Sequence, residues 1–327
     1  MRPRIFVTQP VVESALIRLR AIADVTVNPD GRAVIPKDKL IAGVRSCDFL
    51  FSLLHDPVDR DVVGANPKLR AINSMSITPD NIDVKEATAR GIPVTVVPAL
   101  AVESTADIHF ALLLAVARRV VEGHHLVCAG VFPGSQSNYL LGAGVYGKTI
   151  GLVGGRGRIG RAVARRAKGF SMRILYCGPR RMDELEEREL GATYVPLDQL
   201  LAESDFVSLH PALTPQTRHM IGERELARMK PSAFLINTSR GLVVDEAALI
   251  RALADRRIAG AGLDVFENEP HVDAALAGLT SVVMTPHLGS AVVEVREAMA
   301  NIVVDNIIAV LDGKRPPNIV NPEVLSS

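Results

Sequence analysis

Short apolar runs alternate with segments of helical spacing along most of the chain, and this rhythm occurs twice. Segments such as 12–22 and 83–90 carry the helical spacing. Strands that alternate with helices indicate βαβ units and parallel sheets. The sequence therefore predicts an α/β fold of two doubly wound parallel-sheet domains with a cleft between them. The predicted strands are 4–8, 25–27, 49–53, 69–73 and 94–97, then 149–153, 173–176, 206–210, 233–238, 262–265 and 282–285.

The boundary between the domains is expected near residues 98–101. Ser104–Asp107 resembles a helix N-terminus that opens an apolar helix over 108–121. A helix that is apolar on all sides must be buried, here at a seam between domains or subunits. The amphipathic segment 294–311 is expected to pack back on the first domain. The predicted domains are therefore 1–99 with 288–327, and 100–287.

Composition and charge exclude several classes of protein. The 327 residues carry 37 Lys and Arg against 36 Asp and Glu, a net charge of +1. This balance argues against a nucleic-acid-binding protein and against a polybasic membrane tether. Three well-separated cysteines indicate a reducing compartment. The N-terminus has no signal-peptide pattern, and the uncharged stretch 126–147 has the Gly-rich composition of a loop. A cytoplasmic protein without membrane or nucleic-acid partners is expected.

A glycine-rich turn follows the predicted strand 149–153. Gly155-x-Gly157-x-x-Gly160 stands between that strand and an Arg/Ala-rich helix, which is the context of a Rossmann-like dinucleotide fingerprint. Glycine permits the tight turn, the close approach to the pyrophosphate and the packing of helix on strand. The helix N-terminus then supplies N–H groups to the phosphates. The pattern predicts a dinucleotide site.

The next strand ends without the acidic residue that usually binds the ribose. Cys177 stands at its end, and Arg180 and Arg181 follow. One interpretation is a pocket for the 2′-phosphate of NADP, and the other is a solvated basic turn. We expect NADP to be favoured, with NAD possible.

Three later strands are each followed by a chemically useful residue: Arg240, Glu269 and His287. Ligands of open α/β sheets bind outside the carboxyl ends of the strands, so these side chains can converge on one site. The remaining histidines have no metal-ligand spacing, and no metal site is predicted.

Here the sequence resembles the D-isomer-specific 2-hydroxyacid dehydrogenase family, from about residue 69 to residue 320. The motifs that carry the resemblance are DNIDV (80–84), ESTAD (103–107), GKTIGLVGGRGRIGRAVA (147–164), INTSRGLVVDE (236–246), GLDVFENEP (262–270) and TPHLGS (285–290).

The resemblance implies a role for each catalytic residue. Arg240 is expected to bind the substrate carboxylate through its planar fork. His287 is expected to be the general acid/base, with Glu269 as its partner, because a nearby carboxylate favours the imidazolium. The implied cofactor-binding residues are Thr105, Gly155, Gly157, Arg158, Ile159, Gly160, Arg180, Arg181, His210, Thr238, Asp264 and Gly289.

The chain departs from the family pattern at several positions. Gly154 adds a residue to the phosphate loop, and Pro211 comes one place early. Thr78 stands where the family has a Gly whose amide meets the substrate carboxylate, so Ile77 and Thr78 are the substrate-binding amides expected here. Phe132 stands where the family often has Trp.

The resemblance therefore implies an NAD(P)-dependent 2-hydroxyacid dehydrogenase that acts as a 2-oxo acid reductase on glyoxylate or hydroxypyruvate, and a homodimer is expected. Two alternatives stay open: a phosphite-type dehydrogenase, which the stretch 289–296 also resembles, and a cofactor-sensing corepressor-like binding protein.

Overall fold

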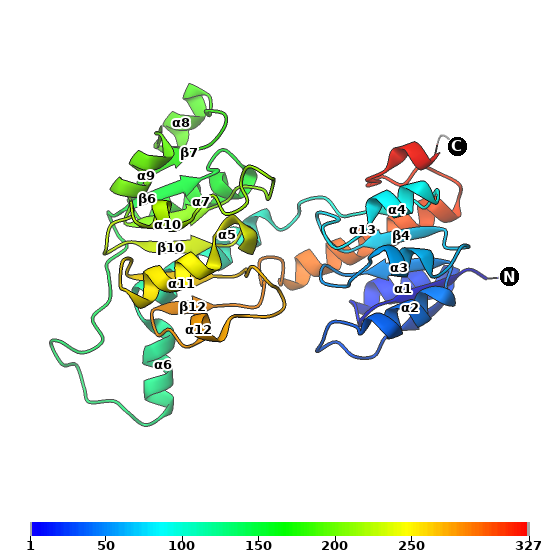
Figure 1. Cartoon of the computed structure of the whole chain (residues 1–327), viewed down its shortest axis with the longest axis horizontal. Helices are drawn as coiled ribbons and strands as arrows, with labels where there is room; N and C mark the ends of the chain where they lie inside the picture. The colour runs from blue at the N-terminus through cyan, green and yellow to red at the C-terminus, as the bar shows by residue number, and fades with distance from the viewer. Residues whose placement is uncertain (1, 326–327) are drawn as a thin grey trace. The chain divides into compact units, whose positions relative to one another are not determined.

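The computed structural model describes residues 2–325 and divides into two compact units. Unit 1 combines the chain up to Leu100 with the chain from Val292 onward, and unit 2 is the continuous stretch Ala101–Ala291. The chain therefore passes from one unit to the other twice (Figure 1).

Unit 1 contains a five-stranded parallel sheet of order β2-β1-β3-β4-β5. Because parallel sheets are covered on both faces, their strands are almost wholly apolar, as β3 is here. The strands are β1 (Arg4–Val7), β2 (Asp24–Val27), β3 (Phe49–Ser52), β4 (Ala71–Ser74) and β5 (Val94–Thr95). The helices are α1 (Glu13–Ile22), α2 (Lys37–Arg45), α3 (Arg60–Gly64), α4 (Val84–Ala89) and α13 (Val293–Leu311), with a short 3₁₀ turn η2 (Pro322–Leu325).

The C-terminal segment completes unit 1. α13 buries Met299, Val303 and Ile307 against α1 and one face of the sheet, while α2, α3 and α4 cover the other face. Asn321 Oδ1 accepts a hydrogen bond from the backbone N–H of Val94 on β5. The expectation that this segment packs on the first domain is confirmed.

Unit 2 contains a seven-stranded parallel sheet of order β12-β11-β10-β9-β6-β7-β8. The strand order reverses between β6 and β9, which is the point where open α/β sheets bind ligands. The strands are β6 (Thr149–Val153), β7 (Arg173–Cys177), β8 (Ala192–Tyr194), β9 (Phe206–Leu209), β10 (Phe234–Asn237), β11 (Gly260–Leu263) and β12 (Val282–Met284). The other elements are α5 (Val102–Ala117), α6 (Val120–Cys128), α7 (Arg158–Gly169), α8 (Glu184–Leu190), α9 (Leu197–Glu203), α10 (Glu223–Leu226), η1 (Gly241–Val243), α11 (Glu246–Ala254) and α12 (Ala274–Ala277).

Side chains alternate between the two faces of this sheet. Ile150 and Leu152 of β6 pack with α5 and α7, whereas Val153 packs with α9, α10 and α11 on the opposite face. The prediction of parallel α/β sheets in both parts of the chain is confirmed.

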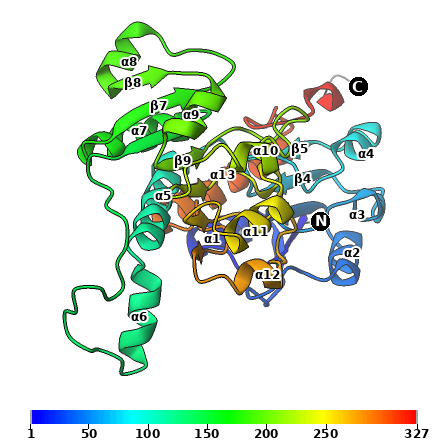
Figure 2. The same ribbon diagram turned by 60° about the vertical axis from the view of Figure 1, so that its left-hand side comes forward.

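The helix predicted over 108–121 is wrong in its bounds. α5 begins at Val102, without a side-chain cap, so Ser104–Asp107 lie inside it. It ends at Ala117 because Arg119 adopts a left-handed conformation (φ 54°), and α6 starts directly after that residue. None of the residues of α6 is buried, and the helix projects from the sheet of unit 2 together with the segment that follows it (Figure 2). The apolar pattern therefore belongs to two helices, of which only α5 is buried.

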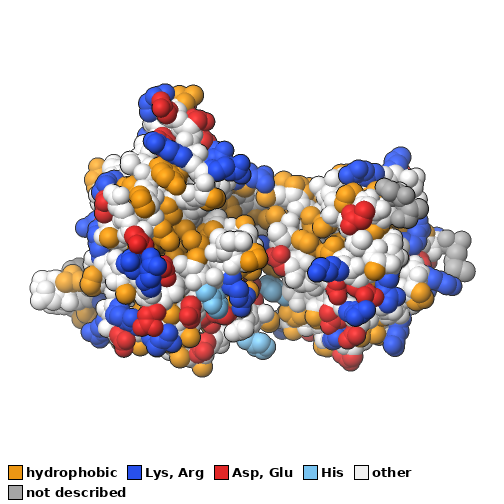
Figure 3. Space-filling model, turned by 45° about the horizontal axis from the view of Figure 1, so that its top comes forward, with side chains coloured by type: hydrophobic (Ala, Val, Ile, Leu, Met, Phe, Trp, Pro, Cys, Tyr) orange, Lys and Arg blue, Asp and Glu red, His pale blue; other side chains and the backbone are white. Residues whose placement is uncertain are grey.

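Basic and acidic side chains are interspersed over the viewed faces of both units, in keeping with the net charge of +1 (Figure 3). No helix within residues 2–325 combines the length and the apolarity needed to cross a membrane.

Candidate active site

The phosphate loop joins β6 to α7 in unit 2. Gly154 leaves the strand with φ 80°, and its N–H donates to the Cys177 carbonyl oxygen on β7 at 2.9 Å. The N–H of Gly157 returns to the Gly154 carbonyl oxygen, also at 2.9 Å, and α7 begins at Arg158. The first amides of a helix, here those of Arg158, Ile159 and Gly160, have no acceptor within it. They are therefore placed to bind an anion.

The glycines of this loop are required by close packing. A Cβ on Gly160 would lie 2.6 Å from the Gly155 carbonyl oxygen, and a Cβ on Gly155 would lie 2.7 Å from the Tyr176 Cβ. At these glycines the loop therefore presents only backbone atoms, without side chains, in front of the N-terminus of α7. This geometry fits the pyrophosphate of a dinucleotide.

The additional Gly154 and the early Pro211 lie against each other. A Cβ on Gly154 would lie 2.9 Å from the Pro211 nitrogen and 3.0 Å from the His210 carbonyl carbon. The extra residue is accommodated by its positive φ, so the fingerprint glycines still open α7. The two departures from the family pattern, Gly154 and Pro211, therefore lie in direct backbone contact at one place in the structure.

The basic turn after β7 distinguishes its two arginines. Arg181 forms two 2.7 Å hydrogen bonds to Glu187, whereas Arg180 has no ion pair with any residue in the described part of the chain. The Arg181 guanidinium and the Tyr176 hydroxyl lower the pKa of Glu187 to about 2. Cys177 is buried at the strand end, and burial raises the pKa of its thiol to about 11. Arg180 is therefore the uncommitted cation of this turn.

His287 and Glu269 form a direct pair. His287 Nδ1 lies 2.8 Å from Glu269 Oε2, and Glu269 Oε1 accepts the N–H of Phe266 at 2.9 Å. Both carboxylate oxygens are thus engaged, one by the imidazole and one by the turn after β11. A His held in this way by a carboxylate is the arrangement of a general acid/base.

Asp264 holds the backbone around His287. Its carboxylate accepts the N–H groups of Leu288 (2.7 Å) and Gly289 (2.9 Å) and the Thr285 hydroxyl (2.6 Å). His287 itself has a left-handed backbone (φ 56°). Burial raises the pKa of Asp264. An ionised carboxylate has about four acceptor positions. Donors of the protein occupy three of these positions on Asp264.

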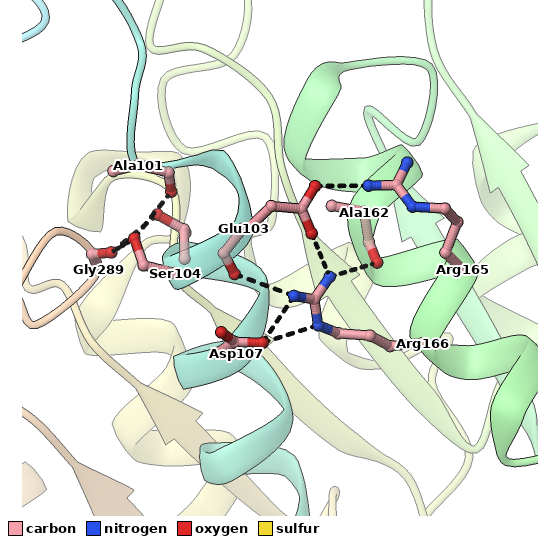
Figure 4. Close-up of polar contacts among 9 residues, drawn as sticks. Ala101, Glu103, Ser104, Asp107, Ala162, Arg165, Arg166 and Gly289 are labelled. Carbon is pink, nitrogen blue, oxygen red and sulfur yellow. Dashed lines mark hydrogen bonds and ion pairs between the residues drawn. The ribbon is translucent and has the colours of Figure 1, made fainter. Parts of the chain in front are cut away.

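The turn after His287 is tied to α5. Ser104 Oγ donates to the Gly289 carbonyl oxygen at 2.7 Å (Figure 4). Thr105 Oγ1 donates to the same oxygen at 3.3 Å. On the same helix, Glu103 and Asp107 both pair with Arg166 of α7. α5 therefore links the His287 turn to the helix that carries the phosphate loop.

Arg240 follows β10 in a turn that packs against the turn carrying Glu269. The Asn237 side-chain N–H donates to the Arg240 carbonyl oxygen at 3.0 Å, and Arg240 Nη1 donates to the Ser239 carbonyl oxygen at 2.8 Å. A Cβ on Gly241 would lie 1.9 Å from the Phe266 carbonyl group. Only glycine permits this approach, which joins the arginine turn to the glutamate turn.

Sequence reasoning missed a second carboxylate–histidine pair. The interpretation of Glu267 as a solvated turn residue is wrong. Its carboxylate lies 2.9 Å from His219 Nε2 and accepts the N–H of Glu246 at 3.2 Å. Glu246 returns the contact by accepting the N–H of Glu267 at 3.0 Å. His219 is far away in sequence, so no local spacing could have revealed the pair.

His210 and Thr238 follow the neighbouring strands β9 and β10 at the ligand edge of the sheet. His210 Nδ1 and Thr238 Oγ1 are buried and have no hydrogen-bond partner within residues 2–325. Buried polar atoms without partners are uncommon and mark places where a ligand can bind.

The two expected substrate-binding amides lie in unit 1, after β4. Ser76 Oγ donates to the Thr78 carbonyl oxygen, and Thr78 Oγ1 donates to Asp80, both at 2.6 Å. These contacts fix the turn around Thr78, and the Ile77 side chain is exposed.

Comparisons with known proteins identify the family of the chain. Residues 110–289 match the model of the D-isomer specific 2-hydroxyacid dehydrogenase NAD binding domain. The chain is 49% identical over 331 residues to a glyoxylate reductase of Thermococcus litoralis, covering 100% of this chain and 99% of that protein. It is 52% identical over 327 residues to a glyoxylate reductase of Korarchaeum cryptofilum, covering 99% and 98%. The solved NADPH-dependent glyoxylate/hydroxypyruvate reductase of Sinorhizobium meliloti, in complex with NADP and malonate, aligns with a TM-score of 0.79 at 33% identity over 98% of this chain and 97% of that one.

Proposed function

The chain belongs to the D-isomer-specific 2-hydroxyacid dehydrogenase family, and from this premise we propose that it reduces glyoxylate or hydroxypyruvate with NADPH. It is a nicotinamide-dependent oxidoreductase of 2-hydroxy acids. The observation that carries the proposal is the His287–Glu269 pair, with the Arg240 turn packed against the Glu269 turn.

In this mechanism the reduced nicotinamide supplies a hydride to the carbonyl carbon when it is bound. His287 protonates the carbonyl oxygen, and Glu269 stabilises the imidazolium that precedes the transfer. Arg240 binds the substrate carboxylate through its planar fork. The amides of Arg158, Ile159 and Gly160 bind the pyrophosphate. Unit 2 is thus the dinucleotide-binding domain and unit 1 the substrate domain.

A substrate panel tests this function. Loss of reduced-nicotinamide absorbance is expected with glyoxylate and hydroxypyruvate, and not in a His287→Gln variant. A gain of reduced-nicotinamide absorbance with phosphite and oxidised cofactor would support the phosphite-type alternative. Cofactor binding without turnover of any substrate would support the corepressor-like alternative. The reductases among the relatives favour the first outcome.

The preference for NADP rests on Cys177 and Arg180. Cys177 brings no carboxylate to repel a 2′-phosphate, and Arg180 is free of ion pairs within residues 2–325. One hydrogen bond to a charged group contributes about 1.5–3 kcal/mol, so NADPH should be preferred over NADH by roughly ten-fold or more.

Single variants separate the two arginines. Arg180→Ala should remove most of the preference, while Arg181→Ala should change it less, because Arg181 is already bound by Glu187. Arg188→Ala, on the adjacent helix, is the control. The measurement is the ratio of kcat/KM with NADPH to kcat/KM with NADH. If neither Arg180→Ala nor Arg181→Ala changes this ratio, the basic turn is a solvated surface that does not contact the cofactor.

We also propose a homodimer built on α6 and the segment after it. Val127, Phe132 and Leu141 are 60%, 78% and 65% exposed, which is unusual for a free surface. A groove of about 1170 Å³ lies beside α6 and is lined by apolar residues that include Leu126, Phe234 and Val283. Groove and apolar segment belong to the same unit, so two copies can exchange them reciprocally.

Light scattering tests the dimer. Phe132→Ser combined with Leu141→Ser should yield monomers, while Leu185→Ser, at an equally exposed position of α8, should not. A dimer that persists in the double variant would contradict this interface.

A cytoplasmic location, the compartment expected from the cysteines, is likewise proposed, and cell fractionation tests it.

A further inference from the structure

Two histidines bridged by a serine, one of them buried and the other partly exposed, lie at the ligand edge of unit 2. His109 is on α5, Ser208 is on β9, and His210 is the first residue after β9. Ser208 Oγ lies 2.6 Å from His210 Nε2 and 3.2 Å from His109 Nε2. His109 and Ser208 are completely buried. The proposed mechanism uses neither of them.

The two distances indicate the direction of the hydrogen bonds. Hydrogen bonds donated by a hydroxyl are shorter than those donated by an N–H group. The short contact therefore suits the Ser208 hydroxyl as donor to His210 Nε2, and the longer contact suits His109 Nε2–H as donor to Ser208 Oγ. In this arrangement the proton of a neutral His210 is on Nδ1.

The unpartnered atoms favour the same direction. Both Nδ1 atoms are buried without a partner within residues 2–325. The reverse direction would leave an N–H donor orphaned on His109, inside the core. The direction chosen here places the orphaned N–H on His210, at the edge where Gly154 and Thr238 also lie.

Both rings are neutral near physiological pH. Burial lowers the pKa of His210 to about 3 and places the pKa of His109 well below its usual value. A neutral imidazole has one donor and one acceptor nitrogen, so the bond at one nitrogen decides the role of the other.

We infer that His109 acts through Ser208 as a positioning residue that sets the tautomer of His210, so that His210 presents Nδ1–H to an acceptor oxygen of the bound dinucleotide. The inference rests on the proposed dinucleotide site at the switch between β6 and β9.

Histidine tautomers in the full-length protein without cofactor test the first half. In ¹⁵N-labelled protein, long-range ¹H–¹⁵N spectra should show His210 protonated at Nδ1. In His109→Phe, which removes the donor, and in Ser208→Ala this population should fall. His109→Gln places an amide donor near the position of Nε2 and should restore it. An Nε2-protonated His210 in the wild type would overturn the inference.

Cofactor affinity tests the second half. NADPH binding by fluorescence, without substrate, should weaken about three- to ten-fold in His109→Phe and Ser208→Ala, which corresponds to one neutral hydrogen bond. Leu113→Val, a core change on the same helix at an apolar residue, is the control. Unchanged affinity in Ser208→Ala, or an equal loss in Leu113→Val, contradicts the inference alone. A wild-type protein that binds neither NADPH nor NADH contradicts the proposed function as well.

Discussion

At the scale of single residues, the chemistry depends on side chains whose geometry a similar residue cannot reproduce. Arg240 offers a planar fork, and lysine is a point charge. Arg240→Lys should lower kcat/KM for glyoxylate by about ten-fold or more, because at least one charge-assisted hydrogen bond of about 1.5–3 kcal/mol is lost. Steady-state kinetics measure this, with the exposed Arg251→Lys as control. Near-normal kinetics would remove Arg240 from the substrate site.

Glu269→Gln should slow carbonyl reduction. Gln can still accept the Phe266 N–H, but a neutral amide then replaces the carboxylate that lies 2.8 Å from His287 Nδ1. A hydrogen bond to a charged group contributes about 1.5–3 kcal/mol, so kcat/KM for glyoxylate should fall by about ten-fold or more. Glu267→Gln is the matched control, because Glu267 pairs with His219. Unchanged steady-state kinetics in Glu269→Gln would show that Glu269 does not act on His287 in this way.

Gly241→Ala should disturb both turns of the site at once. The new Cβ would overlap the Phe266 carbonyl group, so the arginine turn and the glutamate turn must separate. We expect a loss of stability of about 1–3 kcal/mol and a marked loss of activity. Gly169→Ala is the control, because a Cβ there meets no atom within 4 Å. Denaturant unfolding and kinetics measure the two effects, and a variant with wild-type values would contradict the packing argument.

At the scale of elements, α5 connects the site to the core through a buried titratable group. His109 is neutral when folded and takes up a proton when unfolded below about pH 6.5. Since its folded pKa is depressed, His109 leaves the free energy of unfolding undiminished above about pH 6.5 and lowers it progressively as the pH falls below that value.

Removing this group should flatten the acid side of the stability profile. In His109→Gln the slope between about pH 6 and pH 4 should decrease by up to about 1.4 kcal/mol per pH unit relative to the wild type. Urea unfolding at a series of pH values measures it. Parallel profiles for the two proteins would show that His109 is not buried in its neutral form.

The elements also show what a single sequence can predict. Long apolar strands such as β6 and β10 were predictable, because a sheet covered on both faces leaves a continuous apolar run. β8 was missed: it has three residues, of which Thr193 and Tyr194 are exposed. The start of α5 was misplaced because no side chain caps it.

The candidate site divides in the same way. Arg240, Glu269 and His287 stand in motifs that can be read locally. The Glu267–His219 pair and the His109–Ser208–His210 bridge join segments far apart in the chain, and only the fold brings them together. The sequence could not show that Arg181, and not Arg180, forms an ion pair in the basic turn. Its partner Glu187 belongs to no recognisable motif.

At the scale of the whole molecule, unit 2 is inserted within unit 1, since the chain leaves the first sheet at Leu100 and returns to it at Val292. α13 is therefore made last, although it supplies Met299, Val303 and Ile307 to the core that begins with β1.

This order has a consequence during synthesis on the ribosome. Translation at about 5–20 residues per second leaves roughly 10–40 seconds between the emergence of β5 and that of α13. For that time α1 alone covers the face of the first sheet that it later shares with α13, so part of this apolar face stays exposed to solvent. Unit 2 emerges meanwhile as one uninterrupted stretch. The exposed face is therefore a place where a chaperone can bind the nascent chain.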